Sequence, residues 1–146
     1  MKRAPLPTIP HPLHPEFRIL LVDYKVRGFK IPRGYVWDGA SIPGLLRWWM
    51  GDPYDGPHRD AGLVHDYLYE TAKVPRGQAD EVFYRELLDD GDSTYEAKLK
   101  WSAVRLAAAS HYGAKAPWPK FIEESVLRVW EKQIKLDPLP LFGGMS

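Results

Sequence analysis

Proline placement constrains the fold of this 146-residue chain more than any other feature of its sequence. Five prolines fall within residues 1–15, and because proline lacks a backbone donor and has a fixed φ, this arm is predicted to be irregular or polyproline II rather than helical. From residue 58 to residue 116 the chain has a single proline, Pro75, so long helices fit there. The sequence therefore predicts a helical C-terminal part after a non-helical N-terminal part.

Short runs of β-branched and aromatic residues follow the proline-rich arm. Glycine turn signals at Arg27-Gly28 and Arg33-Gly34 separate these runs, which predicts a small antiparallel sheet. A loop then leads to a short helix, for which Ser41 is placed as a cap. The expected strands cover residues 17–26, 29–32 and 35–37, and the expected short helix covers residues 43–49.

Apolar residues with helical spacing begin near residue 58 and continue almost to the C-terminus. Pro75, Gly91 and a cap at Ser93 or Thr94 divide them into four predicted helices. The predicted buried stripe of the third helix consists of Leu99, Ala103, Leu106 and Ala107. The four helices cover about residues 58–72, 77–90, 95–111 and 119–135.

The predicted fold class is α+β, with a small N-terminal antiparallel β-sheet followed by a bundle of about four α-helices. A chain of 146 residues is long enough to form one domain with its own core. We expect residues 1–146 to form that single domain. Its predicted parts are a proline-rich arm (1–16), a β region (17–37), a loop region (38–57), a helical region (58–135) and a Pro/Gly-rich tail (136–146).

Composition excludes several functional classes. The net charge is +1, so no electrostatic footprint for nucleic acid is expected. No apolar run reaches the roughly 18–20 residues of a transmembrane helix. The chain has no cysteine, which excludes disulfides and cysteine-bound zinc and fits synthesis in a reducing cytoplasm. The Trp48-Trp49-Met50 segment is expected in the core, with a lipid-contacting surface patch as the alternative.

The most informative polar residues lie on two neighbouring predicted helices. His65, Asp66 and Tyr69 belong to the first helix, and Asp80 lies in the first turn of the second. His65 and Tyr69 are four residues apart and therefore share a helix face. In an antiparallel helix pair Asp80 reaches both of them across the seam. Such a carboxylate orients an imidazole as a general base.

This constellation has two interpretations. Polar groups buried between helices must be paired whether or not they catalyse a reaction, so the His65–Asp80 pair can be purely structural. In the other interpretation His65 is a base and the neighbouring Asp66, which projects about 100° away around the helix, holds a hard cation. Carboxylates with one histidine suit Ca²⁺, Mg²⁺ or Mn²⁺ at least as well as zinc.

The stretch from Phe29 to about Gly113 resembles a phage and prophage family catalogued as domain of unknown function 1353. The resemblance implies a bacteriophage or prophage origin, and the family name states no activity. The segments that carry it are Ile31–Gly34, Trp37–Pro43, Ala61–Tyr69, Gln78–Asp80 and Val104-Arg105.

The spacing His65-Asp66-x-x-Tyr69, followed by Ala79-Asp80, also resembles the helix pair of phospholipase A2 enzymes, especially the viral and bacterial forms. The resemblance implies that His65 is the base of a hydrolase and activates water. It further implies that the catalytic set is completed by Asp80 and Tyr69, which orient the imidazole.

The same resemblance implies a calcium site beside the His–Asp dyad. Asp66 would be the carboxylate ligand, and the loop at Asp38 and Gly39 would supply carbonyl oxygens. Bound Ca²⁺, or another divalent cation, would polarise the ester carbonyl and hold the oxyanion. The glycine-rich calcium loop of these enzymes is matched here only at Asp38-Gly39.

Two function hypotheses follow from the sequence. The first is a phage-encoded, phospholipase A2-like, metal-assisted ester hydrolase that acts on phospholipid or another ester. The second is a non-catalytic virion or assembly protein in which the His–Asp network is structural. That protein would be made in the host cytoplasm and would contact phage structural proteins or a second copy of itself through its proline-rich tails. The predicted anchors in the tails are Leu6, Ile9, Leu13, Leu139, Leu141 and Phe142.

Overall fold

Two small antiparallel sheets open the chain in the computed structural model, which describes residues 4–39, 41–116 and 118–136. The central sheet has three strands in the order β1-β2-β5, and a separate hairpin pairs β3 with β4. The hairpin turns at Arg27 and Gly28, whose φ angles of 47° and 83° are typical of a tight two-residue turn. The strands are β1 (Thr8–Pro10), β2 (Arg18–Leu20), β3 (Tyr24–Val26), β4 (Phe29–Ile31) and β5 (Val36–Trp37).

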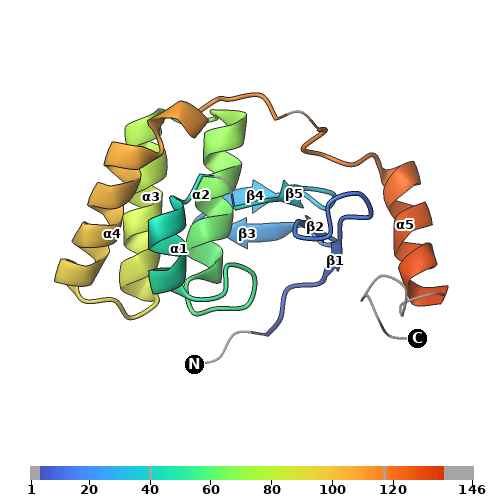
Figure 1. Cartoon of the computed structure of the whole chain (residues 1–146), viewed down its shortest axis with the longest axis horizontal. Coiled ribbons are helices and arrows are strands. Elements are labelled where there is room, and N and C mark those ends of the chain that lie inside the picture. The colour runs from blue at the N-terminus through green and yellow to red at the C-terminus, as the bar shows by residue number, and fades with distance from the viewer. Residues whose placement is uncertain (1–3, 40, 117, 137–146) are drawn as a thin grey trace.

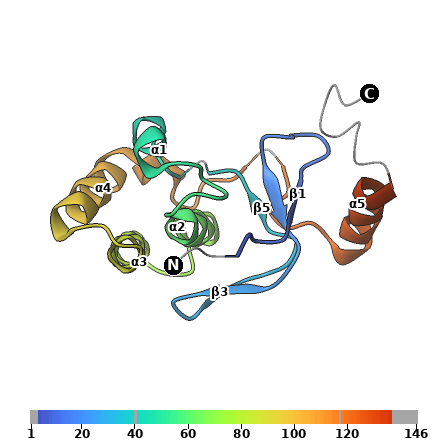
Figure 2. The ribbon, with the colours of Figure 1, turned by 90° about the horizontal axis from the view of Figure 1, so that it is seen from below.

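Five α-helices follow the strands, which confirms the predicted α+β class. Helices α1–α4 pack together on one side of the strands, and α5 lies on the other side (Figures 1 and 2). Ser93 caps α4 through the predicted capping interaction, with Glu96 completing the capping box. The helices are α1 (Gly44–Met50), α2 (Arg59–Thr71), α3 (Arg76–Asp89), α4 (Thr94–Ala107) and α5 (Glu124–Leu136), with a short 3-10 helix, η1 (Ala109–His111), after α4.

The two faces of the central sheet belong to different hydrophobic clusters. Ile9, Ile19 and Val36 are paired in register across the three strands and pack with Leu127 of α5. The next residue along β5, Trp37, points to the opposite face and joins the larger cluster with the helices α1–α4. The sheet therefore separates α5 from the other helices.

The proline-rich arm is more regular than predicted. Residues 8–10 form β1, and Ile9 is 5% exposed against the sheet. Leu6 packs against the larger cluster, whereas Leu13 is 76% exposed. At least part of the arm therefore lies along its own domain. The predicted anchors in the C-terminal tail lie outside the described residues.

Three element boundaries differ from the prediction. Residues 17–26 were expected as one strand, but the chain bends at Val22 between β2 and β3, and the carboxylate of Asp23 accepts a hydrogen bond from the Arg33 N–H at 2.9 Å. Helix α4 ends at Ala107 rather than 111. The last helix begins at Glu124 rather than 119, because residues 120–122 hydrogen-bond to the backbone of residues 34–36 instead.

Within the described part of the chain, no helix combines the length and the apolar character that crossing a membrane requires.

Candidate functional site

A buried histidine at the seam of α2 and α3 forms the centre of the candidate site. His65 has no exposed surface, and its Nε2 lies 2.7 Å from Asp80 Oδ1. The Tyr69 hydroxyl donates a hydrogen bond to the same carboxylate oxygen at 2.7 Å. The rings of His65 and Tyr69 are 4.0 Å apart, as their four-residue spacing on α2 requires. The predicted meeting of these three side chains is confirmed.

Two arginines complete the surroundings of Asp80, and the sequence did not predict either of them. Arg105 of α4 donates to Asp80 Oδ2 at 2.8 Å, and Arg76 of α3 donates to the Tyr69 hydroxyl at 2.9 Å. Burial alone would raise the pKa of the Asp80 carboxyl, but the hydrogen bonds from His65, Tyr69 and Arg105 outweigh it and lower that pKa. Asp80 is therefore ionised at neutral pH.

The second ring nitrogen of His65 faces the loop before α1. Ser41 Oγ lies 2.8 Å from His65 Nδ1 and also hydrogen-bonds to Asp66 Oδ1. The Ser41 backbone N–H donates to the same Asp66 oxygen at 3.1 Å. The predicted capping role of Ser41 is wrong, since α1 has no side-chain cap and the serine side chain is turned into the protein.

These contacts define the protonation state of the imidazole. Burial lowers the pKa of His65 below its usual value, against the opposing effect of Asp80, so the ring is neutral at pH 7. An ionised Asp80 only accepts hydrogen bonds, so the ring proton must be on Nε2. Nδ1 is then an unprotonated acceptor directed at the Ser41 hydroxyl. This is the tautomer that a general base requires.

Asp66 is buried beside this base and is incompletely paired. Its Oδ1 is bonded by Ser41, while its Oδ2 has no hydrogen-bond partner among the described residues. Burial, followed by the charge of Asp38, raises the pKa of Asp66 to about 7. The carboxyl group is therefore divided between its protonated and ionised forms near neutral pH.

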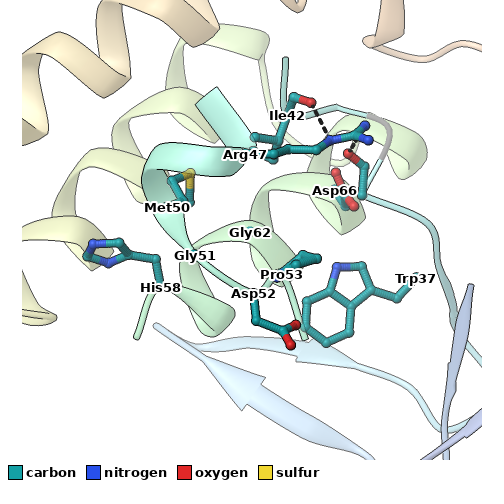
Figure 3. Close-up of a pocket in the computed structure, with 11 residues that line it drawn as sticks. Trp37, Ile42, Arg47, Met50, Gly51, Asp52, Pro53, His58, Gly62 and Asp66 are labelled. Carbon is teal, nitrogen blue, oxygen red and sulfur yellow. Dashed lines mark hydrogen bonds between the residues drawn. The ribbon is translucent and has the colours of Figure 1, made fainter. Parts of the chain in front are cut away.

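The other two predicted metal ligands already face cationic side chains. Asp38 Oδ2 accepts a hydrogen bond from Lys120 Nζ at 2.8 Å. The Gly39 carbonyl oxygen accepts from Arg47 Nη2 at 2.8 Å, and the same guanidinium donates to the Ile42 carbonyl at 3.0 Å. Figure 3 shows Arg47 among the residues that line the same cavity as Asp66.

This donor set does not fit a calcium ion. Calcium takes six to eight oxygen ligands, and here Asp38 Oδ2 and the Gly39 carbonyl oxygen already accept hydrogen bonds from Lys120 and Arg47. No group of three or more His, Asp or Glu side chains able to hold a metal ion occurs in residues 4–39, 41–116 and 118–136. Calcium binding remains a prediction of the sequence.

Two cavities flank the Ser41 loop. The larger, of about 200 Å³, is open enough for a small ligand group and includes Ser41 in its wall. The smaller, of about 30 Å³, has room for about one water molecule and includes Asp66 (Figure 3). The larger cavity is lined by Asp38, Ser41, Glu70, His111, Ala114, Lys115, Ala116 and Trp118.

Residues 17–104 match a protein-family model described as "Protein of unknown function (DUF1353)". The chain belongs to this family. The match confirms the resemblance to domain of unknown function 1353, although it begins earlier and ends earlier than the predicted span from Phe29 to Gly113. The DUF1353 segment contains Ser41, His65 and Asp80, and Arg105 directly follows its last residue.

Two curated relatives from Sinorhizobium fredii (strain NBRC 101917 / NGR234) are similar to this chain. "Uncharacterized protein y4jT" is 32% identical over 74 residues, which cover 51% of this chain and 22% of the relative. "Uncharacterized protein y4iH" is 31% identical over 83 residues, which cover 57% of this chain and 35% of the relative. The chain thus spans about a fifth and about a third of the lengths of these relatives. No solved structure matches the chain.

Proposed function

We propose that this chain is a hydrolase of carboxylic esters in which His65 is the general base, as in the phospholipase A2 enzymes that its helix pair resembles. The observation that carries the proposal is that the two ring nitrogens of His65 face different partners, a carboxylate and a hydroxyl group. Asp80 accepts a hydrogen bond from the Nε2–H group at 2.7 Å, and Nδ1, which is unprotonated in the neutral ring, lies 2.8 Å from a hydroxyl oxygen. A structural pairing with the ionised Asp80 requires the same tautomer, so the support for catalysis is that the free nitrogen faces a hydroxyl group.

The chemistry assigned to these residues is proton transfer at His65 Nδ1. When Nδ1 takes a proton from an attacking hydroxyl, the ring becomes an imidazolium. The ionised Asp80 stabilises that charge, and the hydrogen bonds from Tyr69 and Arg105 keep the carboxylate in place. The protein residues alone therefore supply a base and its orienting group.

Phospholipid is the ester that we propose as substrate. The resemblance implies it, and the surface of α1 supports it. Leu45 and Trp48 are 81% and 75% exposed on the helix that follows the Ser41 loop. Core packing was expected for the Trp48-Trp49-Met50 segment, yet only Met50 is buried. Exposed Leu and Trp side chains suit contact with a lipid–water boundary.

One observation favours the alternative of a non-catalytic protein. His65 and Asp80 both have no exposed surface, which is also what a structural hydrogen-bond network between helices requires. In this alternative the network stabilises the contact of α2 with α3. The resemblance to a phage family implies that such a non-catalytic protein would have a virion or assembly role.

The two functions are separated by the variant His65→Gln. The purified chain is assayed with p-nitrophenyl acetate and with phosphatidylcholine vesicles, and folding is followed by circular dichroism. A hydrolase should lose activity in His65→Gln while keeping its fold, and the matched control His14→Gln should retain activity. Absence of hydrolysis by the wild-type chain on both substrates would refute the proposed function.

A further inference from the structure

The Ser41 hydroxyl lies where an attacking group must lie for His65 to act on it. Ser41 Oγ is 2.8 Å from His65 Nδ1, and His65 Nε2 is 2.7 Å from Asp80 Oδ1. The three side chains thus place a hydroxyl, an imidazole and a carboxylate in line, while the Ser41 hydroxyl also donates a hydrogen bond to Asp66 Oδ1. A nucleophile within reach of a base, and a base oriented by a third group, together meet the geometric criterion for nucleophilic catalysis.

We infer that Ser41 is the nucleophile of this hydrolase and that the reaction passes through an acyl-serine. The inference rests on the proposed function, because it specifies which hydroxyl His65 deprotonates. In the first step, the Ser41 hydroxyl takes the place of the activated water that the resemblance to phospholipase A2 enzymes implies. Asp66 Oδ1 holds Ser41 in place, because it accepts hydrogen bonds from the Ser41 hydroxyl and, at 3.1 Å, from the Ser41 backbone N–H.

The cavity whose wall includes Ser41 is the proposed place for the substrate, and Ser41 itself is 1% exposed. It measures about 200 Å³, which is below the roughly 300–1,000 Å³ of pockets that enclose a whole drug-sized ligand. It therefore suits the ester group and its immediate neighbours rather than a complete substrate. Its acidic residues Asp38 and Glu70 are both paired with Lys120 at 2.8 Å, so the two carboxyl groups share one positive charge.

The oxyanion of the reaction needs donors that the loop backbone does not supply. The Ser41 N–H is bonded to Asp66, and the Ile42 N–H is bonded to the Gly39 carbonyl. Lys115 lines the same cavity as Ser41 and brings a positive charge to it. We assign to this side chain the stabilisation of the negative oxygen.

The reaction then balances with water as the second reactant. Ser41 Oγ forms a bond to the ester carbonyl carbon as its proton moves to His65 Nδ1. The bond from carbon to the alcohol oxygen breaks, and that oxygen takes the proton from Nδ1 and leaves as an alcohol. Water next attacks the acyl-serine and gives a proton to Nδ1. The bond from carbon to Oγ breaks, Oγ takes the proton back, and a carboxylic acid is released.

Covalent labelling of the wild-type chain tests the inference without a mutation. A fluorophosphonate probe is incubated with the folded protein, and the labelled peptide is identified by mass spectrometry. We expect one adduct, on Ser41, that is absent from His65→Gln. Hydrolytic activity without any adduct on Ser41 would overturn the covalent mechanism.

The variant Ser41→Ala gives the second measurement, with Ser102→Ala as the matched control. We expect Ser41→Ala to lose at least about a thousandfold in the rate of p-nitrophenyl acetate hydrolysis, as loss of a serine nucleophile does, and Ser102→Ala to retain its rate. If Ser41→Ala keeps its activity while His65→Gln loses it, water is the nucleophile and only this inference fails. If the wild-type chain neither hydrolyses nor becomes labelled, the proposed function fails as well.

Discussion

Replacing Asp80 by Asn separates catalysis from stability most sharply. Arg105 donates to one oxygen of Asp80, and His65 and Tyr69 donate to the other. Because the guanidinium of Arg105 is always a donor, the new amide should direct its oxygen to Arg105 and its NH₂ to His65. The NH₂ group then donates to Nε2, the ring proton moves to Nδ1, and Nδ1 no longer accepts a proton from Ser41.

The structure also sets the expected loss of stability. Hydrogen bonds to a charged group contribute about 1.5–3 kcal/mol each, against about 1 kcal/mol for neutral ones. Asp80 is fully buried, but the Arg105 side chain is 35% exposed. The contribution of the Arg105–Asp80 hydrogen bond to the free energy of unfolding is therefore at the low end of that range. Summed over the bonds from His65, Tyr69 and Arg105, Asp80→Asn should lower the free energy of unfolding by about 2–4 kcal/mol. That corresponds to roughly 5–15 °C in Tm.

The expected loss of activity is much larger. In a Ser-His-Asp triad, an Asp-to-Asn change that leaves the imidazole in the wrong tautomer lowers kcat by about ten-thousandfold. Urea unfolding measured by tryptophan fluorescence gives the stability, and p-nitrophenyl acetate hydrolysis gives kcat, both at a temperature where the variant is folded. Tyr69→Phe is the control, because it removes one hydrogen bond to Asp80 and leaves the tautomer unchanged. Activity in Asp80→Asn within about tenfold of Tyr69→Phe would show that Asp80 does not orient a base.

Three further perturbations test other parts of the structure. Millimolar Ca²⁺ should leave Tm unchanged in differential scanning fluorimetry, because Gly39 and Asp38 already face Arg47 and Lys120; a clear rise would support the predicted metal site. The pKa of Asp66 is raised from 3.8 to about 7, so the folded chain binds more protons than the unfolded one in that window and stability should fall as pH rises through it. Asp66→Asn should make this slope of Tm against pH shallower, and an unchanged slope would exclude Asp66 as its source. Deleting residues 1–12 removes β1 and uncovers the sheet, so Tm should fall while the helical circular dichroism is kept; a truncated chain that melts like the full-length chain would make the arm passive.

The part of the site on α2 and α3 was predictable because it depends on local geometry. His65 and Tyr69 share a face through their helical spacing, and the connection before Pro75 is too short for the next helix to run anything but antiparallel. Asp80 was expected in the first turn of its helix and lies just beyond that turn, because α3 begins at Arg76; it still has to lie near the end of α2. Periodicity and one short connection were sufficient for this prediction.

Ser41 was misinterpreted because its partner is distant in sequence. A serine two residues before a proline at a helix start is typical of a cap, and capping is a local property. The observed contact joins Ser41 to His65, 24 residues away, and no local signal specifies it. One indication of a different role was available. Ser41 lies between Gly39 and Pro43, inside a segment that carries the resemblance to domain of unknown function 1353.

The buried face of α4 shows how polar partners override hydrophobic spacing. The predicted stripe contained Leu99 and Leu106, but these side chains are 42% and 86% exposed. Lys100 is buried instead, because its ammonium group is paired with Asp92 at 2.8 Å. A pattern based on apolar residues assigns a buried lysine to the wrong face, since the carboxylate that compensates its charge comes from another segment.

His58 is another buried histidine, and its contacts differ from those of His65. His58 has a carboxylate at each ring nitrogen, with Asp90 at 3.2 Å from Nδ1 and Asp92 at 3.0 Å from Nε2. Both nitrogens are thus committed to acidic groups, and Lys100 closes the cluster at 3.3 Å from Nε2. His65 has a carboxylate on one nitrogen and a hydroxyl on the other. A ring held by acid on one side and facing a hydroxyl on the other can move a proton from that hydroxyl, whereas a ring between two carboxylates can only join the segments that carry them.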